Sequence, residues 1–124
     1  MKEKIKTFKD LDVWKEGHKL VLSIYKVSKS FPKEELFGLT SQMRRAAVSI
    51  TSNIAEGFGR SSYKDKNNFY QMAFGSITEL RNQLIIAKDV EYIGLSDFDA
   101  IDSQAMLVEK ICRGLINKSK EFYS

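Results

Sequence analysis

The chain has 124 residues, of which 43% are hydrophobic and 29% charged, and its net charge is +4. This length and composition are typical of one globular domain with its own core, so we treat residues 1–124 as a single domain. One proline and seven glycines leave few breakers for the turns of a β fold and favour long helices. Cys112 is the only cysteine, which excludes a disulfide within the chain and indicates a small buried residue in a reducing compartment.

Neither a secretion signal nor a membrane span is recognisable in the sequence. The first ten residues are basic but lack the apolar segment of a signal peptide. The longest purely aliphatic run, Leu84–Ala87, is far shorter than a membrane span. We therefore expect a cytoplasmic protein with no membrane partner.

Positive charge is concentrated in particular segments of the chain. Residues 1–30 carry eight basic and four acidic side chains, whereas residues 69–108 carry two and six. Residues 109–124 are basic again, with four and two. Basic segments of this kind can form a surface that faces phosphate, although a solvated helical surface of mixed charge explains the same numbers.

The first predicted helix covers residues 12–30. Asp10 or Asp12 is expected to cap its start. Pro32 is expected to end it, because a residue that precedes proline avoids the helical region. Its core-facing residues alternate in steps of four and three, which places them on one side of a helix. They are Val13, Gly17, Leu20, Ile24, Val27 and Phe31.

The second predicted helix begins at a cap formed by Thr40 or Ser41. It is expected to end at Gly57 or Gly59, where glycine tolerates a left-handed conformation. Its core face is expected to consist of Leu39, Met43, Ala46, Ile50 and Ile54.

The third and fourth predicted helices begin at a repeated pattern of serine followed three residues later by aspartate. Ser62 and Asp65 resemble a capping box that opens a helix to about residue 90. Ser96 and Asp99 are expected to open the last helix, which continues to about residue 122.

Four long helices joined by short loops predict an all-α, antiparallel up-down-up-down four-helix bundle. The third and fourth helices are apolar over more than the single side that a bundle core requires. We attribute this surplus to contacts between copies of the chain, although a wide core or scattered surface residues are the alternative.

The residue sets of common enzymes and metal sites are missing from the sequence. There is one histidine, His18, and no Glu-x-x-His pair or phosphate-binding glycine loop. One histidine and one cysteine do not build a nucleophilic triad. We therefore expect a non-enzymatic protein without catalytic residues, metal or cofactor.

Small and polar residues recur at helical spacing on the second and third helices, which predicts that these helices pack closely and share a polar cluster. The cluster is expected to consist of Asn53, Glu56, Ser76 and Glu79. Its available counter-ions are Arg45, Arg60 and Arg81. Because buried polar groups are costly when unpaired, we interpret the cluster as fixing the register between helices or subunits. A ligand-binding or catalytic role for Glu56 and Glu79 is the alternative.

Nucleic acid is the partner that the basic residues suggest. Lys15, Lys19 and Lys26 share one side of the first helix, and a second group surrounds Tyr63, an aromatic residue able to stack on a base. No recognised RNA-binding or DNA-binding motif is present. The candidate nucleic-acid-binding residues are Lys15, Lys19, Lys26, Arg44, Arg45, Arg60, Lys64 and Lys66.

Several long motifs carry a resemblance to a known family. They are residues 8–14 (FKDLDVW), 31–32 (FP), 42–50 (QMRRAAVSI) and 52–60 (SNIAEGFGR), with Gly75, Ser76, Glu79 and Leu80. The chain is similar over nearly its whole length to the bacterial four-helix-bundle family of 23S rRNA-intervening sequence proteins. Thr51 stands where many relatives carry proline.

This resemblance implies a four-helix bundle that assembles into a homopentamer. Some relatives are encoded within insertions in rRNA genes, and a related branch binds nucleic acid and a reverse transcriptase through a basic pentameric barrel. We therefore expect an oligomeric protein that binds RNA or DNA through its basic surface, with RNA as the first expectation. The alternative is an interaction scaffold that recruits a protein partner and has no direct role with nucleic acid.

Overall fold

The structure, a computed structural model, describes residues 4–123. Its long helices are α1 (Asp12–Ser28), α2 (Leu39–Phe58), α3 (Tyr63–Asp89) and α4 (Leu95–Lys120). Two short 3-10 helices, η1 (Phe8–Asp10) and η2 (Lys33–Glu35), precede α1 and α2. The described residues form no strand, which confirms the prediction of an all-α fold with four long helices.

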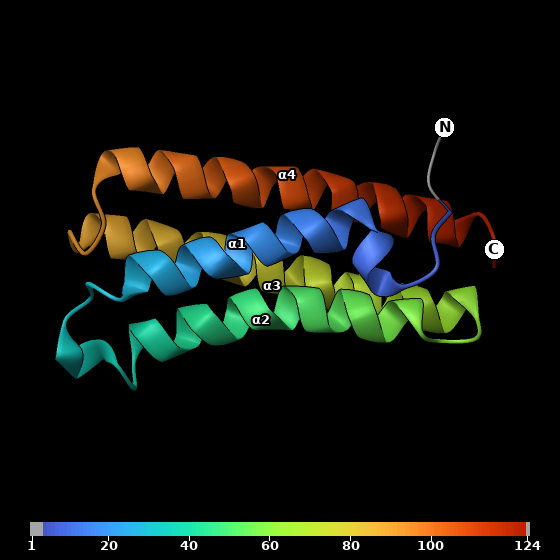
Figure 1. The fold of residues 1–124 in the computed structure, drawn as a ribbon, viewed down its shortest axis with the longest axis horizontal. Helices are drawn as coiled ribbons and strands as arrows, with labels where there is room; N and C mark the ends of the chain where they lie inside the picture. The colour runs from blue at the N-terminus through green and yellow to red at the C-terminus, as the bar shows by residue number, and fades with distance from the viewer. Residues whose placement is uncertain (1–3, 124) are drawn as a thin grey trace.

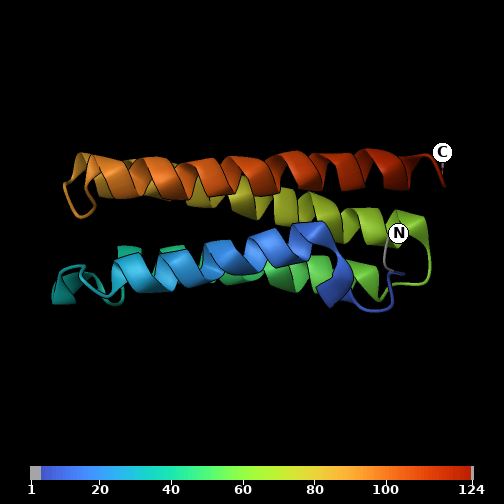
Figure 2. The same ribbon diagram turned by 45° about the horizontal axis from the view of Figure 1, so that its top comes forward.

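The four helices lie side by side along one long axis (Figures 1 and 2). α2 and α4 each contact both α1 and α3. The connections from α1 to α2 and from α3 to α4 lie at one end, and the α2–α3 connection lies at the other (Figure 1). The described N- and C-terminal segments both lie near the α2–α3 end (Figure 1).

Aliphatic side chains from all four helices meet in one core, as the predicted seams require. Its largest side chains are fully buried. They are Val13, Leu20 and Ile24 of α1; Met43, Ile50 and Ile54 of α2; Ile77, Leu80 and Leu84 of α3; and Val108 and Cys112 of α4. None of the helices within residues 4–123 combines the length and the apolar character needed to cross a bilayer.

The start of α1 differs from the sequence prediction. Neither Asp10 nor Asp12 caps it, because the N-cap position is Leu11, which offers no side-chain acceptor. Asp10 instead accepts hydrogen bonds from the backbone N–H groups of Lys6 and Thr7, at 2.9 and 3.0 Å, in a capping box that belongs to η1. The carboxylate therefore stabilises the turn before the helix, and these two bonds lower the pKa of Asp10.

The start of α2 also differs from the prediction, whereas the helix ends at Phe58, within the predicted range of residues 57–59. The N-cap is Gly38, and the Glu35 carboxylate accepts from the backbone N–H of Leu39 at 3.2 Å, so neither Thr40 nor Ser41 is the cap. Gly59 follows the helix with φ −79°, so α2 ends without a left-handed residue.

Ser62 caps α3 as predicted, because its Oγ accepts from the backbone N–H of Asp65 at 3.1 Å. The prediction that Ser96 caps α4 is wrong, because the helix already begins at Leu95 after Gly94. Ser96 therefore lies inside the first turn of α4.

The turn from α3 to α4 contains Glu91, whose φ of 68° is left-handed. The N–H of Tyr92 donates to the carbonyl of Ala87 at 2.8 Å and closes the end of α3 around this residue. Side chains with a Cβ disfavour this conformation and glycine does not. We expect Glu91→Gly to raise the free energy of unfolding by about 0.5–1 kcal/mol, measured by urea denaturation. Glu91→Ala, which keeps the Cβ and removes the charge, is the control; an equal gain from alanine would contradict the explanation.

Candidate nucleic-acid interface

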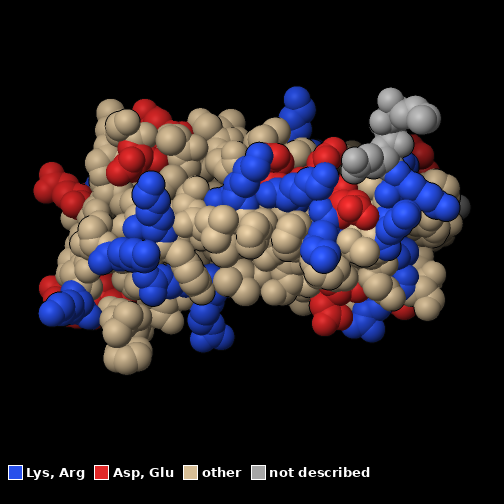
Figure 3. Space-filling model, in the orientation of Figure 1, with Lys and Arg blue, Asp and Glu red and all other residues tan. Residues whose placement is uncertain are grey.

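The lysines of α1 project from the side of the helix opposite its buried residues. Lys15, Lys19 and Lys26 are all exposed, whereas Val13 and Gly17 are buried. Lys19 is paired with Glu16 at 3.1 Å, and Lys15 and Lys26 form neither a hydrogen bond nor an ion pair with any described residue. Figure 3 shows lysine and arginine side chains over the middle of this face and toward both of its ends.

The adjacent arginines of α2 point in different directions. Arg44 is half-buried; its Nε donates to Ser28 Oγ at 2.9 Å and its guanidinium lies 4.9 Å from the centre of the Tyr25 ring. It therefore holds α1 against α2. Arg45 is exposed and lines a shallow hollow of about 600 Å³.

The basic residues around the α2–α3 connection are also engaged to different degrees. Arg60 pairs with Glu56 at 3.1 Å and lies over the Phe69 ring. Lys66 donates to the carbonyl of Phe58, and partial burial lowers the pKa of this lysine. Lys64 is exposed and forms neither a hydrogen bond nor an ion pair within residues 4–123. Of these three cations, Lys64 is therefore the one held by no protein acceptor.

Additional cations lie at the same end of the molecule as Lys64. The short segment before α1 and the end of α4 both lie there (Figure 1). The exposed lysines of these two segments include Lys6, Lys9, Lys118 and Lys120. These lysines were not among the predicted binding residues, but the basic composition of both terminal segments indicated positive charge there. Tyr63, 42% exposed, stacks on Phe122 at 4.6 Å between ring centres and joins α3 to the end of α4.

The predicted polar cluster is only partly assembled. Ser49 Oγ lies 2.9 Å from Ser76 Oγ, and Asn53 Nδ2 donates to Ser49 Oγ at 3.0 Å. Glu56 and Glu79 are exposed and bond to Arg60 and Gln83 instead, so the prediction that all four residues meet is wrong. The two carboxylates stay hydrated at the surface, whereas small hydroxyl groups fit between closely packed helices. Ser49 is the linking residue that the predicted cluster omitted.

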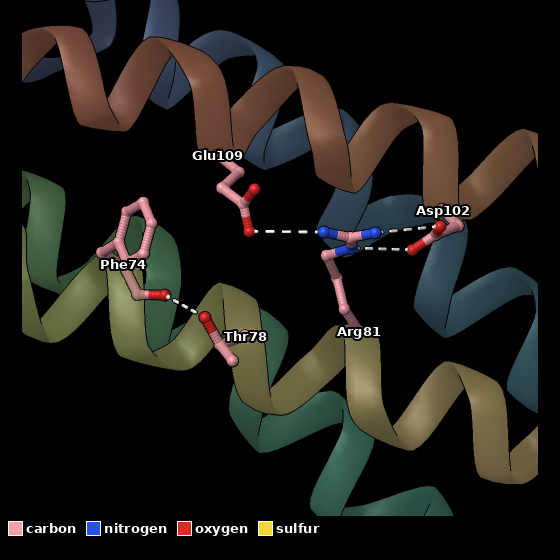
Figure 4. Close-up of polar contacts among 5 residues, drawn as sticks. All are labelled: Phe74, Thr78, Arg81, Asp102 and Glu109. Atoms are coloured by element: carbon pink, nitrogen blue, oxygen red, sulfur yellow. Dashed lines mark hydrogen bonds and ion pairs between the residues drawn. The ribbon is translucent and has the colours of Figure 1, made fainter.

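Arg81 has partners on α4 (Figure 4). Its Nε and Nη2 donate to the two carboxylate oxygens of Asp102 at 2.9 and 3.3 Å, and its Nη1 donates to Glu109 at 3.4 Å. The expected role of Arg81 as counter-ion to Glu56 or Glu79 is therefore wrong. The hydrogen bond with Asp102 raises the pKa of Arg81 and joins α3 to α4.

The lone cysteine and histidine have ordinary structural surroundings. Cys112 is fully buried, and burial raises the pKa of its thiol to about 12, so it holds almost no reactive thiolate at neutral pH. His18 stacks on Trp14 at 4.9 Å between ring centres. Within residues 4–123, no three histidine, cysteine or acidic side chains are grouped as metal ligands would be.

These features define an all-α protein of four packed helices with a row of exposed lysines. Residues 9–114 match the family of 23S rRNA-intervening sequence proteins, and the chain belongs to this family. This confirms the resemblance found in the sequence.

A solved structure supports the same fold. It is a 1.70 Å crystal structure of a protein of unknown function from the S23 ribosomal protein family of Bacteroides thetaiotaomicron, 23% identical in sequence. The match has a TM-score of 0.79 and covers 85% of this chain and 95% of the other. No curated protein matches the sequence.

Proposed function

We propose that this chain is a non-enzymatic nucleic-acid-binding protein, with RNA as its principal ligand, that acts in the cytoplasm as a homo-oligomer. The observation that carries this proposal is the lysine row of α1, in which Lys15 and Lys26 are exposed without a protein acceptor. Membership of the 23S rRNA-intervening sequence family agrees with an RNA ligand.

The dimensions of the lysine row suit a nucleic-acid backbone. Lys15 and Lys26 are separated by eleven positions, or about 16 Å along the helix axis. A nucleic-acid strand presents a phosphate about every 3.4 Å of helix axis, so this row spans about five of them. Lys64 and the terminal lysines would extend the contact toward one end of the molecule.

Assembly would multiply this modest basic surface. We propose an antiparallel up-down-up-down bundle that forms a homopentamer; the alternating ends of the helix connections in Figure 1 support the topology. Several lysine rows on one particle would bind a long RNA more tightly than one row, because the later contacts are intramolecular.

Binding through phosphate contacts predicts a steep dependence on salt. We expect the affinity for a structured RNA, measured by fluorescence anisotropy, to fall about twentyfold or more between 50 and 200 mM salt, the result expected for three contacts per protomer. Duplex DNA measured in the same series reports the preference for RNA. Absence of binding at the lowest salt concentration would overturn the proposal.

An interaction scaffold is the second candidate, because apolar side chains are exposed on α2 and on the loop before it. Phe37 is 94% exposed and Val48 is 39% exposed. Recovery of one dominant protein partner in a pull-down that resists nuclease treatment, together with absence of RNA binding, would favour this function.

A further inference from the structure

Phe37, just before α2, is the most exposed large hydrophobic side chain of the described residues. Phe37 is 94% exposed and Leu36 49% exposed. Two shallow hollows of about 600 and 470 Å³ adjoin here, and both are lined by Phe37, Ser41, Arg45 and Ser49. Aromatic side chains usually bury most of their area, so a phenylalanine beside two hollows is typical of a contact surface. We define the α2 surface as Leu36, Phe37, Arg45 and Val48.

A second surface of the same chain has the complementary character. Ile85, Leu95 and Met106 are 46, 65 and 52% exposed. Leu95, Asp99 and Met106 are separated by four and seven positions, which places them on one side of α4. Asp99 is exposed and forms neither a hydrogen bond nor an ion pair within the described chain, and the same is true of Arg45. We define the α3–α4 surface as Ile85, Leu95, Asp99 and Met106.

The two surfaces lie at the same level along the molecule. The Ser49–Ser76 hydrogen bond fixes the register of α2 against α3, and the Arg81–Asp102 contact fixes α3 against α4. Residue numbers increase in opposite directions along α2 and α3, and again along α3 and α4 (Figure 1). Arg45, one turn before Ser49, therefore lies level with residue 80 of α3 and about one turn, or about 6 Å, from the level of Asp99.

We propose that the α2 surface of one copy binds the α3–α4 surface of a second copy. Phe37 packs between Ile85 and Leu95 of that copy, and Arg45 pairs with its Asp99. This inference rests on the proposed assembly and names its contact. The basic and apolar character of one surface matches the acidic and apolar character of the other, which selects a second copy over an unrelated partner.

This contact is head-to-tail, because it joins two different surfaces of the same chain. α2 and α4 lie on different sides of the molecule, since each contacts α1 and α3. A repeated head-to-tail contact closes into a ring when successive copies are related by rotation without translation. Because the two surfaces lie at nearly the same level along the bundle axis, the contact introduces little translation along that axis, so the geometry favours a closed ring over an open filament.

The test measures the mass of the full chain by light scattering coupled to size-exclusion chromatography. Wild-type protein is expected at a multiple of 14.2 kDa. We expect Phe37→Ser, Arg45→Glu and Asp99→Arg each to weaken association about tenfold or more and to shift the mass toward the monomer. Because these side chains are exposed, the circular dichroism spectrum is expected to retain the wild-type helix signal.

Exchanging the two charges makes the test specific for the contact between Arg45 and Asp99. The double variant with Arg45→Glu and Asp99→Arg restores opposite charges across the contact, so it is expected to regain the wild-type mass. Two variants serve as matched controls and are expected to keep that mass. They are Leu22→Ser, on the outer side of α1, and Lys118→Glu, near the C-terminal end of α4.

Several results would overturn the inference, and they distinguish failure of the assembly from failure of this contact. If wild-type protein is monomeric at every concentration, the proposed assembly fails as well. If the Phe37 and Arg45 variants keep the wild-type mass, or the double variant stays dissociated, the assembly stands and this contact is wrong. Dissociation by Leu22→Ser to the same extent as by Phe37→Ser would also show that the effect is not specific to the α2 surface.

Discussion

Replacing Lys15, Lys19 and Lys26 together by glutamate is expected to weaken RNA binding by about 100-fold or more at 100 mM salt. Each replacement removes an attraction to phosphate and adds a repulsion. All three side chains are exposed on the side of α1 that faces away from the core, so the fold is expected to survive. Fluorescence anisotropy with one RNA gives the affinity, and the salt slope is expected to become shallower because fewer counterions are released.

A second triple variant tests whether the loss of RNA affinity depends on these three positions or only on the net charge of the protein. Lys33, Lys110 and Arg113 are exposed basic residues outside the proposed interface, and their replacement by glutamate changes the net charge by the same amount. We expect a much smaller loss of affinity from this variant. Equal losses from the two triple variants would mean that RNA responds to overall charge and that the α1 row is not the interface.

Gly57→Ala is expected to destabilise the protein by about 1–2 kcal/mol, although alanine is the better helix former by about 1 kcal/mol. A Cβ at residue 57 would lie 2.7 Å from Cε1 of Tyr70 and 3.0 Å from Cβ of Phe69. Tyr70 is 3% exposed, so its ring has little room to move away. Urea denaturation measures the loss, and Tm is expected to fall by roughly 4–10 °C.

Gly59→Ala is the matched control for the glycine prediction. A Cβ at residue 59 would meet only backbone oxygens of its own turn, the nearer at 3.7 Å, and its φ of −79° suits any residue. Its stability is expected to change by less than about 0.5 kcal/mol. If Gly57→Ala were as stable as the wild-type protein, α2 and α3 would have to separate easily near Tyr70, and their close approach there would not contribute to stability.

The observed helix caps show where neighbouring residues in the sequence are enough to predict the start of a helix. Ser62 caps α3 as its sequence predicts, because its acceptor and the N–H of Asp65 lie within one turn of the same segment. The same Ser-x-x-Asp pattern did not predict the start of α4, whose cap is Gly94, two residues before Ser96. The α2 cap comes from Glu35 in a preceding short helix, and that contact depends on how the chain turns back between α1 and α2.

The candidate site was predicted as a set of residue types but not as a set of contacts. The lysines of α1 were found because charge at helical spacing faces away from an apolar seam. Arg44 and Lys66 were selected by the same charge criterion, yet Ser28 and the carbonyl of Phe58 hold them. No property of either residue alone distinguishes a cation held by the protein from one available to phosphate.

The sequence by itself determined the all-α class, the family and the apolar seams, because helical periodicity and local motifs depend on residues a few positions apart. Only the tertiary structure decided which polar groups meet. Ser49 and Ser76 are 27 residues apart in sequence, and Arg81 and Asp102 are 21 apart. Such pairs depend on the register between whole helices, which is set by the packing of the entire core. The same register brings the surfaces of Phe37 and Asp99 to one level, where a second copy can bind them.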